Sequence, residues 1–224
     1  MKGLHRWDLS YSQARQLQTQ LAAQVRYIRL RRRPRLVAGL DCAFSEDGKL
    51  VFAAVVTLSL PGLDVVETAA ASRPVAFPYI PGLLSFREAP VCITAVEKLQ
   101  NQPDLFIIDG QGVAHPRRLG LAAHLGLFFD RPTIGCAKSR LIGEYDDPPL
   151  KKGGSSPLIE GGEVIGAVLR TRANVKPVFV SVGHKCLLED AVRFTLACTK
   201  GYRLPEPTRL AHHLVSQLRK SWTL

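Results

Sequence analysis

The 224-residue sequence lacks any uninterrupted apolar run that approaches the ~20 residues a helix needs to cross a bilayer. Its first eight residues, MKGLHRWD, also lack the apolar stretch of a signal peptide. No segment combines a helix face rich in Lys and Arg with one rich in Trp, Phe and Leu, as membrane-surface helices do. We therefore expect a cytoplasmic protein that has no membrane partner.

Cysteine is also scarce and irregularly placed. The five cysteines are odd in number and form no C-x-x-C pair, which argues against a zinc cluster or a disulfide framework. Most of them lie in apolar segments, as is typical of buried thiols in a reducing compartment. They are Cys42, Cys92, Cys136, Cys186 and Cys198.

Acidic residues are few compared with basic ones. The sequence has 19 Asp and Glu against 30 Lys and Arg, so its formal net charge is +11. Such an excess favours a polyanionic partner, of which nucleic acid is the commonest. The charge indicates contact with phosphates and says nothing about base sequence or chemistry.

The hydrophobic pattern predicts an α/β fold. An amphipathic helix is expected over 10–30, and three strands in a row predict an antiparallel meander. A strand, a helix and a strand between residues 104 and 138 imply a parallel crossover, and 146–162 reads as a loop. We expect one domain over residues 1–224, built on a mixed sheet. The expected strands are 36–44, 50–60, 63–75, 104–109, 132–138, 163–171 and 177–182, and the further helices are 85–101, 117–127, 186–199 and 207–220.

Three carboxylates stand in unusual surroundings. Asp41 interrupts an apolar strand, Asp109 ends another, and Glu88 lies in the first turn of a helix, on its apolar face. A carboxylate in an apolar environment is costly unless it is paired or binds a metal. Parallel neighbouring strands would bring both aspartates to the carboxyl edge of the sheet, where α/β proteins bind ligands.

Each acid also has a structural interpretation. Ser85 and Glu88 fit a capping box, in which the glutamate satisfies the helix N-terminus. Asp109 and Gly110 fit a turn at the end of a strand. Asp41 has the weakest alternative, because strand interiors disfavour aspartate.

Together the acids predict a site for a hard divalent cation, Mg²⁺ or Mn²⁺, acting on phosphates. Lys138 ends the next strand at the same edge and could steady the charge that develops during phosphodiester hydrolysis. A solvated surface lysine is an equally good interpretation of Lys138.

Four ordered motifs resemble the endonuclease V family. They are residues 77–88 (FPYIPGLLSFRE), 109–118 (DGQGVAHPRR), 132–141 (PTIGCAKSRL) and 203–209 (RLPEPTR). With residues 5–9 (HRWDL), the similarity extends over most of the chain.

The resemblance implies a ribonuclease-H-like fold and a Mg²⁺-dependent DNA-repair endonuclease, with Mn²⁺ as a possible substitute. Its substrate would be double- or single-stranded DNA that contains deoxyinosine. The nick would fall at the second phosphodiester bond on the 3′ side of the lesion and leave 3′-hydroxyl and 5′-phosphate ends. The resemblance makes Asp41, Glu88 and Asp109 the metal ligands and catalytic acids. Lys138 and His212 complete the expected catalytic set, in which His212 could orient a metal-bound water or shuttle a proton.

Residues 78–81 have a further interpretation. Pro78 and Pro81 stiffen the backbone and give Tyr79 and Ile80 a rigid apolar tip that could enter a base stack. An ordinary turn or a P-x-x-P ligand is the alternative. The resemblance also implies a base pocket near Gly82, Leu84, Gly110 and His115, where glycine permits close backbone approach.

Two questions stay open from the sequence. The same motifs would suit an endoribonuclease for inosine in RNA, or a nucleic-acid-binding domain that no longer cleaves. The arginine cluster at 29–35 fits contacts to flanking phosphates as well as it fits a solvated linker. We expect a monomer.

Overall fold

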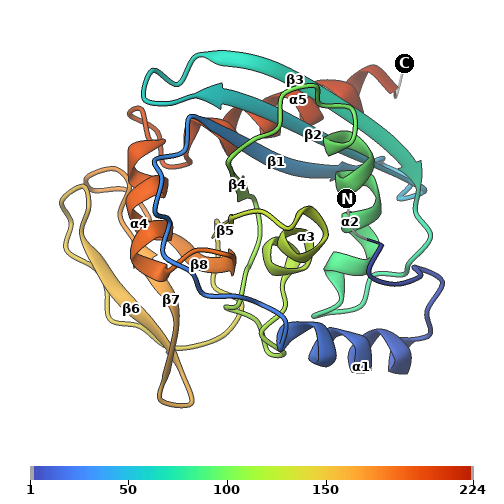
Figure 1. Ribbon diagram of the computed structural model, residues 1–224, viewed down its shortest axis with the longest axis horizontal. Helices are drawn as coiled ribbons and strands as arrows, with labels where there is room; N and C mark the ends of the chain where they lie inside the picture. Colours follow the sequence, from blue (N-terminus) through green and yellow to red (C-terminus); the bar gives the residue numbers. More distant parts are fainter. Residues whose placement is uncertain (1–2, 223–224) are drawn as a thin grey trace.

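The computed structural model describes residues 3–222, and its centre is one mixed sheet of eight strands (Figure 1). The order across the sheet is β3-β2-β1-β4-β5-β8-β7-β6. The strands are β1 (Leu36–Phe44), β2 (Leu50–Ser59), β3 (Val65–Pro74), β4 (Leu105–Ile108), β5 (Thr133–Ala137), β6 (Ser155–Glu160), β7 (Glu163–Leu169) and β8 (Val178–His184).

Strand directions follow the expected topology. β1, β2 and β3 form the antiparallel meander, whereas β4 pairs in parallel with both β1 and β5. β4 and the paired part of β1, from Val37 to Leu40, are buried and apolar, as parallel strands covered on both faces usually are. The carboxyl ends of β1, β4 and β5 therefore meet at one edge.

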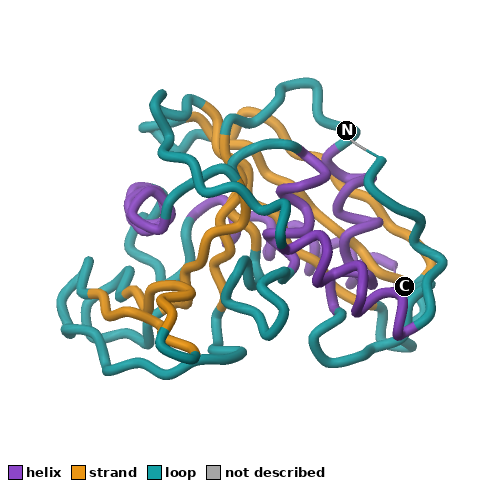
Figure 2. The backbone as a smooth tube through the Cα atoms, turned by 60° about the horizontal axis from the view of Figure 1, so that its bottom comes forward, coloured by secondary structure: helices purple, strands orange, loops and turns teal. Residues whose placement is uncertain are grey.

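Five helices surround the sheet. They are α1 (Tyr11–Ala22), α2 (Leu84–Val96), α3 (Leu121–Phe129), α4 (Leu188–Ala197) and α5 (Glu206–Trp222). α2 packs on β2 and β3, while α5 packs on β1 and β2 from the opposite face. Figure 2 shows α4 apart from the other helices, at the left beside the region of β6–β8.

Gly39 determines how closely α5 approaches the sheet. A Cβ at this position would lie 1.9 Å from the carbonyl carbon of Pro207. Glycine lets the first turn of α5 rest directly on β1. That contact places the next turns of α5 beside Asp41.

Two sequence predictions, the helix over 10–30 and the loop over 146–162, are wrong in their extent. Helix α1 ends at Ala22 rather than near residue 30, because backbone groups beyond it bond to distant side chains. The Arg26 amide donates to His184 Nδ1 (3.2 Å) and the Leu30 amide to Asp190 Oδ2 (2.9 Å). The expected loop at 146–162 contains β6, an edge strand whose Pro157 is tolerated because an edge needs fewer ladder bonds.

The other expected elements are present, with ends shifted by a few residues. All five cysteines are free, and four of them are buried. No helix in residues 3–222 has the length and apolar character of a membrane span. The expected domain limits, residues 1 and 224, lie outside the described residues, so the extent of the domain stays a prediction.

Candidate active site

Strand register brings Asp41 and Asp109 together. Leu40 of β1 pairs with Ile108 of β4 in parallel, so the residues that follow them are neighbours. The Asp109 amide donates to the Leu40 carbonyl at 3.0 Å. Both aspartates thus lie side by side at the carboxyl edge of the sheet.

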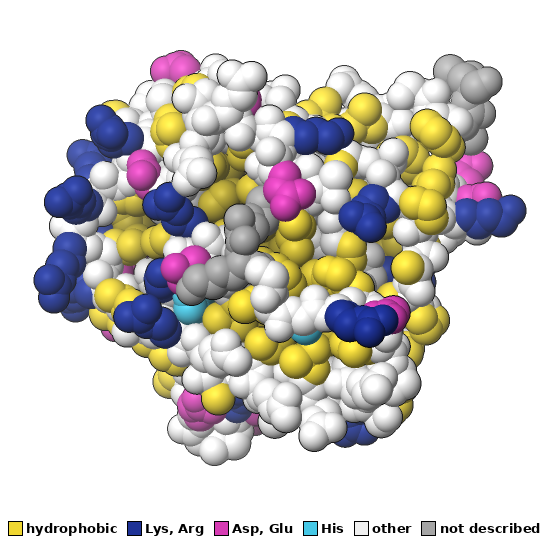
Figure 3. Space-filling view, turned by 45° about the vertical axis from the view of Figure 1, so that its right-hand side comes forward, with side chains coloured by type: hydrophobic (Ala, Val, Ile, Leu, Met, Phe, Trp, Pro, Cys, Tyr) yellow, Lys and Arg dark blue, Asp and Glu magenta, His cyan; other side chains and the backbone are white. Residues whose placement is uncertain are grey.

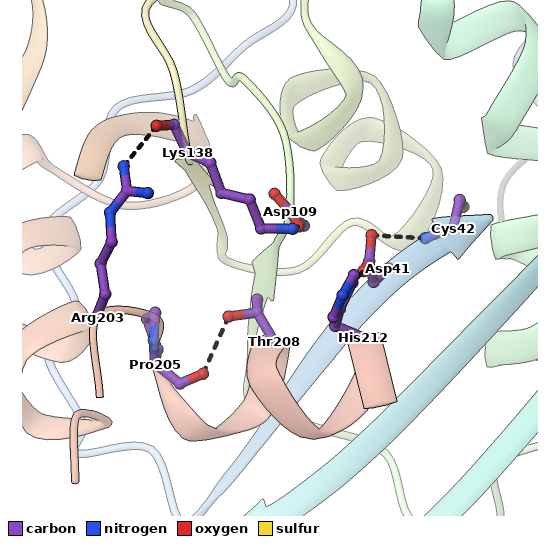
Figure 4. A network of polar contacts seen from close by, with 8 residues as sticks. All are labelled: Asp41, Cys42, Asp109, Lys138, Arg203, Pro205, Thr208 and His212. Carbon is purple, nitrogen blue, oxygen red and sulfur yellow. Dashed lines mark hydrogen bonds and ion pairs between the residues drawn. The ribbon is translucent and has the colours of Figure 1, made fainter. Parts of the chain in front are cut away.

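His212 reaches the same point from α5. Its Nδ1 lies 2.7 Å from Asp41 Oδ2, and its side chain is 51% exposed (Figure 4). One ligand atom each from Asp41, Asp109 and His212 lies within 4.8 Å of the other two. His213, the next residue, is also exposed and belongs to no such group among residues 3–222.

Lys138 supplies the cation nearest to this group. Its Nζ forms an ion pair with Asp109 Oδ2, and its main-chain carbonyl accepts a 2.6 Å hydrogen bond from Arg203 Nη2 (Figure 4). Arg203 Nη2 also donates to the Pro177 carbonyl at 2.8 Å. The Lys138 side chain is 40% exposed, so it is a surface lysine whose ammonium group is paired with an acid of the site, and its catalytic role stays a prediction.

Glu88 is buried in α2 and lies outside the group of three. Burial, reinforced by the negative charges of Asp41 and Asp109, raises its pKa to about 8. The capping-box alternative is wrong: Leu83 is the N-cap, it makes no side-chain cap bond, and Ser85 bonds elsewhere. Glu88 therefore does not satisfy the helix end, and its ionisation is coupled to the two aspartates of this site.

The donor set fits a hard divalent cation. Burial and the nearby Asp109 also raise the pKa of Asp41, against the opposing effect of its bond to His212. The acids thus repel one another although the protein as a whole is strongly basic. Two carboxylates and an imidazole at this separation could share one ion, which would relieve that repulsion.

A cavity of about 380 Å³ adjoins the acids. Asp109 and Lys138 belong to both the cavity wall and the acid site. All the expected lesion-binding residues except Pro78 line the cavity, namely Tyr79, Ile80, Pro81, Gly82, Leu84, Gly110 and His115. Tyr79 is 70% exposed, so its ring projects from the cavity rim into solvent.

Main-chain geometry shapes the cavity at Gly82. Its φ of +78° lies in the left-handed region, which favours glycine. Its carbonyl accepts from Gln18 Nε2 at 3.0 Å and from Arg117 Nη2 at 2.8 Å. Burial, reinforced by the charge of Arg117, lowers the pKa of His115 to about 4, so His115 is neutral at pH 7.

Three residues of the cavity or its supports were missed in the sequence. Gln18 is fully buried on the apolar stripe of α1, between Ala14 and Leu21, and a polar residue in that position was the available signal. Arg117 lies inside the motif at 109–118 and has no signal of its own, whereas Ser85 fits a capping box, which gives no indication of its bond to His124.

Basic side chains are spread over the molecule rather than confined to the site. On the face in Figure 3, Lys and Arg side chains gather mainly toward the left-hand edge, while hydrophobic side chains cover much of the centre. In the 29–35 cluster all five arginines are exposed, and the Arg35 amide bonds to Asp104, at the end of β1 opposite to the acids. Contact of this cluster with phosphates stays a prediction.

Comparison with known proteins identifies the family. The family model of endonuclease V matches residues 19–213. The chain belongs to the endonuclease V family. This places it among nucleases, enzymes that hydrolyse phosphodiester bonds, and the expected ribonuclease-H-like α/β fold is confirmed.

Its relatives match over nearly the whole chain. The endonuclease V of Trichormus variabilis is 53% identical over 213 residues, which cover 95% of this chain and 96% of the relative. The crystal structure of the Streptomyces avermitilis endonuclease V has a TM-score of 0.93 at 44% identity, covering 97% and 96% of the two chains. An endonuclease V from Ciona intestinalis, in complex with a 23mer DNA containing an inosine followed by a ribo-adenosine, matches with a TM-score of 0.83 at 29% identity, covering 95% and 99%.

Proposed function

We propose that this member of the endonuclease V family is a DNA-repair enzyme that recognises deoxyinosine and hydrolyses the second phosphodiester bond on its 3′ side. The observation that carries the proposal is the shared wall: Asp109 and Lys138 line the cavity and also belong to the acid site. A base held in the cavity therefore lies beside groups suited to phosphodiester hydrolysis. The inosine-containing DNA bound by the Ciona intestinalis relative supports the choice of lesion.

Asp41, Asp109 and His212 would hold Mg²⁺, or Mn²⁺ in its place, with Glu88 nearby. When bound, such an ion supplies an acidified water and stabilises negative charge on phosphate oxygens. Hard cations prefer the oxygen ligands that the two aspartates provide. A chain with a net charge of +11 adds long-range attraction for the nucleic-acid backbone.

The remaining side chains have distinct tasks. Lys138, fixed by Asp109 and by the bond from Arg203, places an ammonium group where charge develops on the scissile phosphate. His212, whose Nδ1 bonds to Asp41, would be held by that bond in the orientation that the ion requires. Tyr79, on a backbone stiffened by Pro78 and Pro81, would fill the gap left by the extruded base.

Product mapping tests the proposal. Single- and double-stranded DNA carrying one deoxyinosine would be incubated with the protein and Mg²⁺, with EDTA as the control. We expect one nick, at the second bond 3′ to the lesion, with 3′-hydroxyl and 5′-phosphate ends, and none in EDTA. Binding without a nick would favour a non-cleaving nucleic-acid-binding domain instead.

An endoribonuclease for inosine in RNA is the second candidate. The observation in its favour is that the DNA bound by the Ciona intestinalis relative has a ribo-adenosine after the inosine. DNA, RNA and hybrid strands of one sequence, compared by kcat/KM, would decide between the two activities. A monomeric state and a cytoplasmic location stay predictions; light scattering would test the first.

A further inference from the structure

A chain of hydrogen bonds runs from the N-terminal segment to the cavity. His5 Nδ1 lies 2.6 Å from the Arg6 carbonyl oxygen, and His5 Nε2 lies 2.8 Å from His124 Nε2. His124 Nδ1 in turn lies 3.0 Å from Ser85 Oγ. Ser85 belongs to the first turn of α2 and lines the cavity. Three segments distant in sequence are joined by these contacts.

Aromatic rings pack against the two histidines of this chain. Trp7 and Phe128 stack at 5.2 Å, and His5 meets Phe128 edge-on at 5.2 Å. His124 is fully buried, and burial lowers its pKa to about 3; burial also lowers the pKa of His5. Both imidazoles are therefore neutral at pH 7, and each has one donor nitrogen and one acceptor nitrogen.

This neutrality fixes the direction of every bond. A carbonyl oxygen only accepts, so His5 Nδ1 donates to Arg6 and His5 Nε2 must accept. His124 then donates from Nε2 and accepts at Nδ1, which leaves Ser85 as the donor. No other proton placement satisfies all three contacts with neutral rings. The hydroxyl hydrogen of Ser85 is thus committed to His124, and its oxygen has only lone pairs left to offer.

We propose that Ser85 is a specificity-determining residue, whose hydroxyl oxygen accepts a hydrogen bond from an N–H group of the base in the cavity. The inference rests on the proposed function. Hypoxanthine carries a hydrogen on N1, whereas adenine has a lone pair there, so of these two bases only hypoxanthine matches an acceptor that lies opposite N1. Guanine also has an N1 hydrogen, so Ser85 separates oxo-purines from adenine and does not separate hypoxanthine from guanine. His5 and His124 are positioning residues, which act through Ser85.

DNA binding measured in EDTA, where the DNA is not cleaved, tests the role of Ser85. Four forms of the protein, wild type, Ser85→Ala, Ser85→Thr and His5→Ala, would be titrated with duplexes that carry deoxyinosine, deoxyadenosine or deoxynebularine at one site. Deoxynebularine has an unprotonated N1 and no 6-substituent. We expect Ser85→Ala to lower the inosine-to-nebularine affinity ratio about tenfold, the size of one hydrogen bond. Ser85→Thr should restore the ratio, and affinity for the adenine duplex should stay unchanged.

Further outcomes distinguish a failure of the proposed function from a failure of the role assigned to Ser85. Ser221→Ala, on the exposed end of α5, is the matched control and should keep the wild-type ratio. A wild-type protein without preference for inosine over adenine would overturn the proposed function itself. A wild-type preference that Ser85→Ala leaves intact would overturn only the role of Ser85. If Ser85→Ala loses its helical circular dichroism, His5→Ala carries the test, because it also frees the hydroxyl; an unchanged ratio would then overturn the inference.

Discussion

The acid site and the base cavity share a wall but are built in different ways. The acid site is made of three side chains with metal-binding atoms, Asp41, Asp109 and His212, which three segments bring within 4.8 Å of one another. The cavity is largely apolar and main chain, with its polar groups fixed by bonds such as those at the Gly82 carbonyl. Charge in the first region suits an ion and a phosphate, whereas fixed donors and acceptors in the second suit a neutral base. Substitutions should therefore impair hydrolysis in one region and recognition in the other.

The largest effect is expected at the two aspartates. Asp41→Asn and Asp109→Asn remove an anionic ligand each, so cleavage of inosine DNA should fall by about 10³-fold or more. Binding of the same DNA in EDTA should remain, because the cavity is intact. Asp47→Asn, in an exposed turn, is the matched control and should cleave normally. Near-normal cleavage by either site variant would show that the substituted aspartate is not a required metal ligand.

His212 should have the next largest effect. His212→Ala removes the imidazole that bonds to Asp41, and we expect kcat to fall about 10²-fold with little change in KM. The exposed neighbour in His213→Ala is the control and should leave kcat unchanged. Equal effects from the two substitutions would show that His212 has no special part in the reaction.

Glu88 should make the metal-free protein less stable as the pH rises. Its folded-state pKa of about 8 lies above the ordinary glutamate value of 4.5, so between these pH values the folded state holds a proton that the unfolded state has lost. The free energy of unfolding should fall between these pH values, by up to about 1.4 kcal/mol per pH unit. Buried His115, His124 and His184, with lowered pKa values, act in the opposite direction below pH 6.5.

Urea denaturation of wild type and Glu88→Gln across this range isolates the contribution, because the histidines are common to both. The difference in unfolding free energy should change steadily with pH in EDTA. A constant difference would mean that the carboxyl is ionised in the folded protein.

Tyr79 should have a smaller effect, and it should be confined to recognition. Tyr79→Ala removes the exposed ring at the cavity rim, so the preference for inosine over adenine sites should fall about tenfold. The Mg²⁺ concentration that gives half-maximal cleavage should not move. Tyr202→Ala, another exposed tyrosine, is the control. Unchanged discrimination in Tyr79→Ala would rule out the wedge.

The sequence predicted the residues that line the site better than the contacts that support them, for a physical reason. Asp41 and Asp109 break apolar strands, and the position of an acid in a strand predicts the edge at which it lies. Ser85 was misread as a cap because its true partner, His124, is 39 positions away. The end of α1 was missed for the same reason, since tertiary bonds to His184 and Asp190 override helical periodicity. A hydrogen bond between residues that are far apart in the sequence leaves no periodic pattern around either residue, so the sequence alone does not predict it.

Calorimetric titration with Mn²⁺ in the absence of DNA tests the central claim most directly. Wild type should bind the ion, while Asp41→Asn and Asp109→Asn should each lose that binding and keep their circular dichroism. Asp47→Asn should bind as wild type does. Wild-type affinity for Mn²⁺ in both site variants would contradict a metal centre built on Asp41 and Asp109.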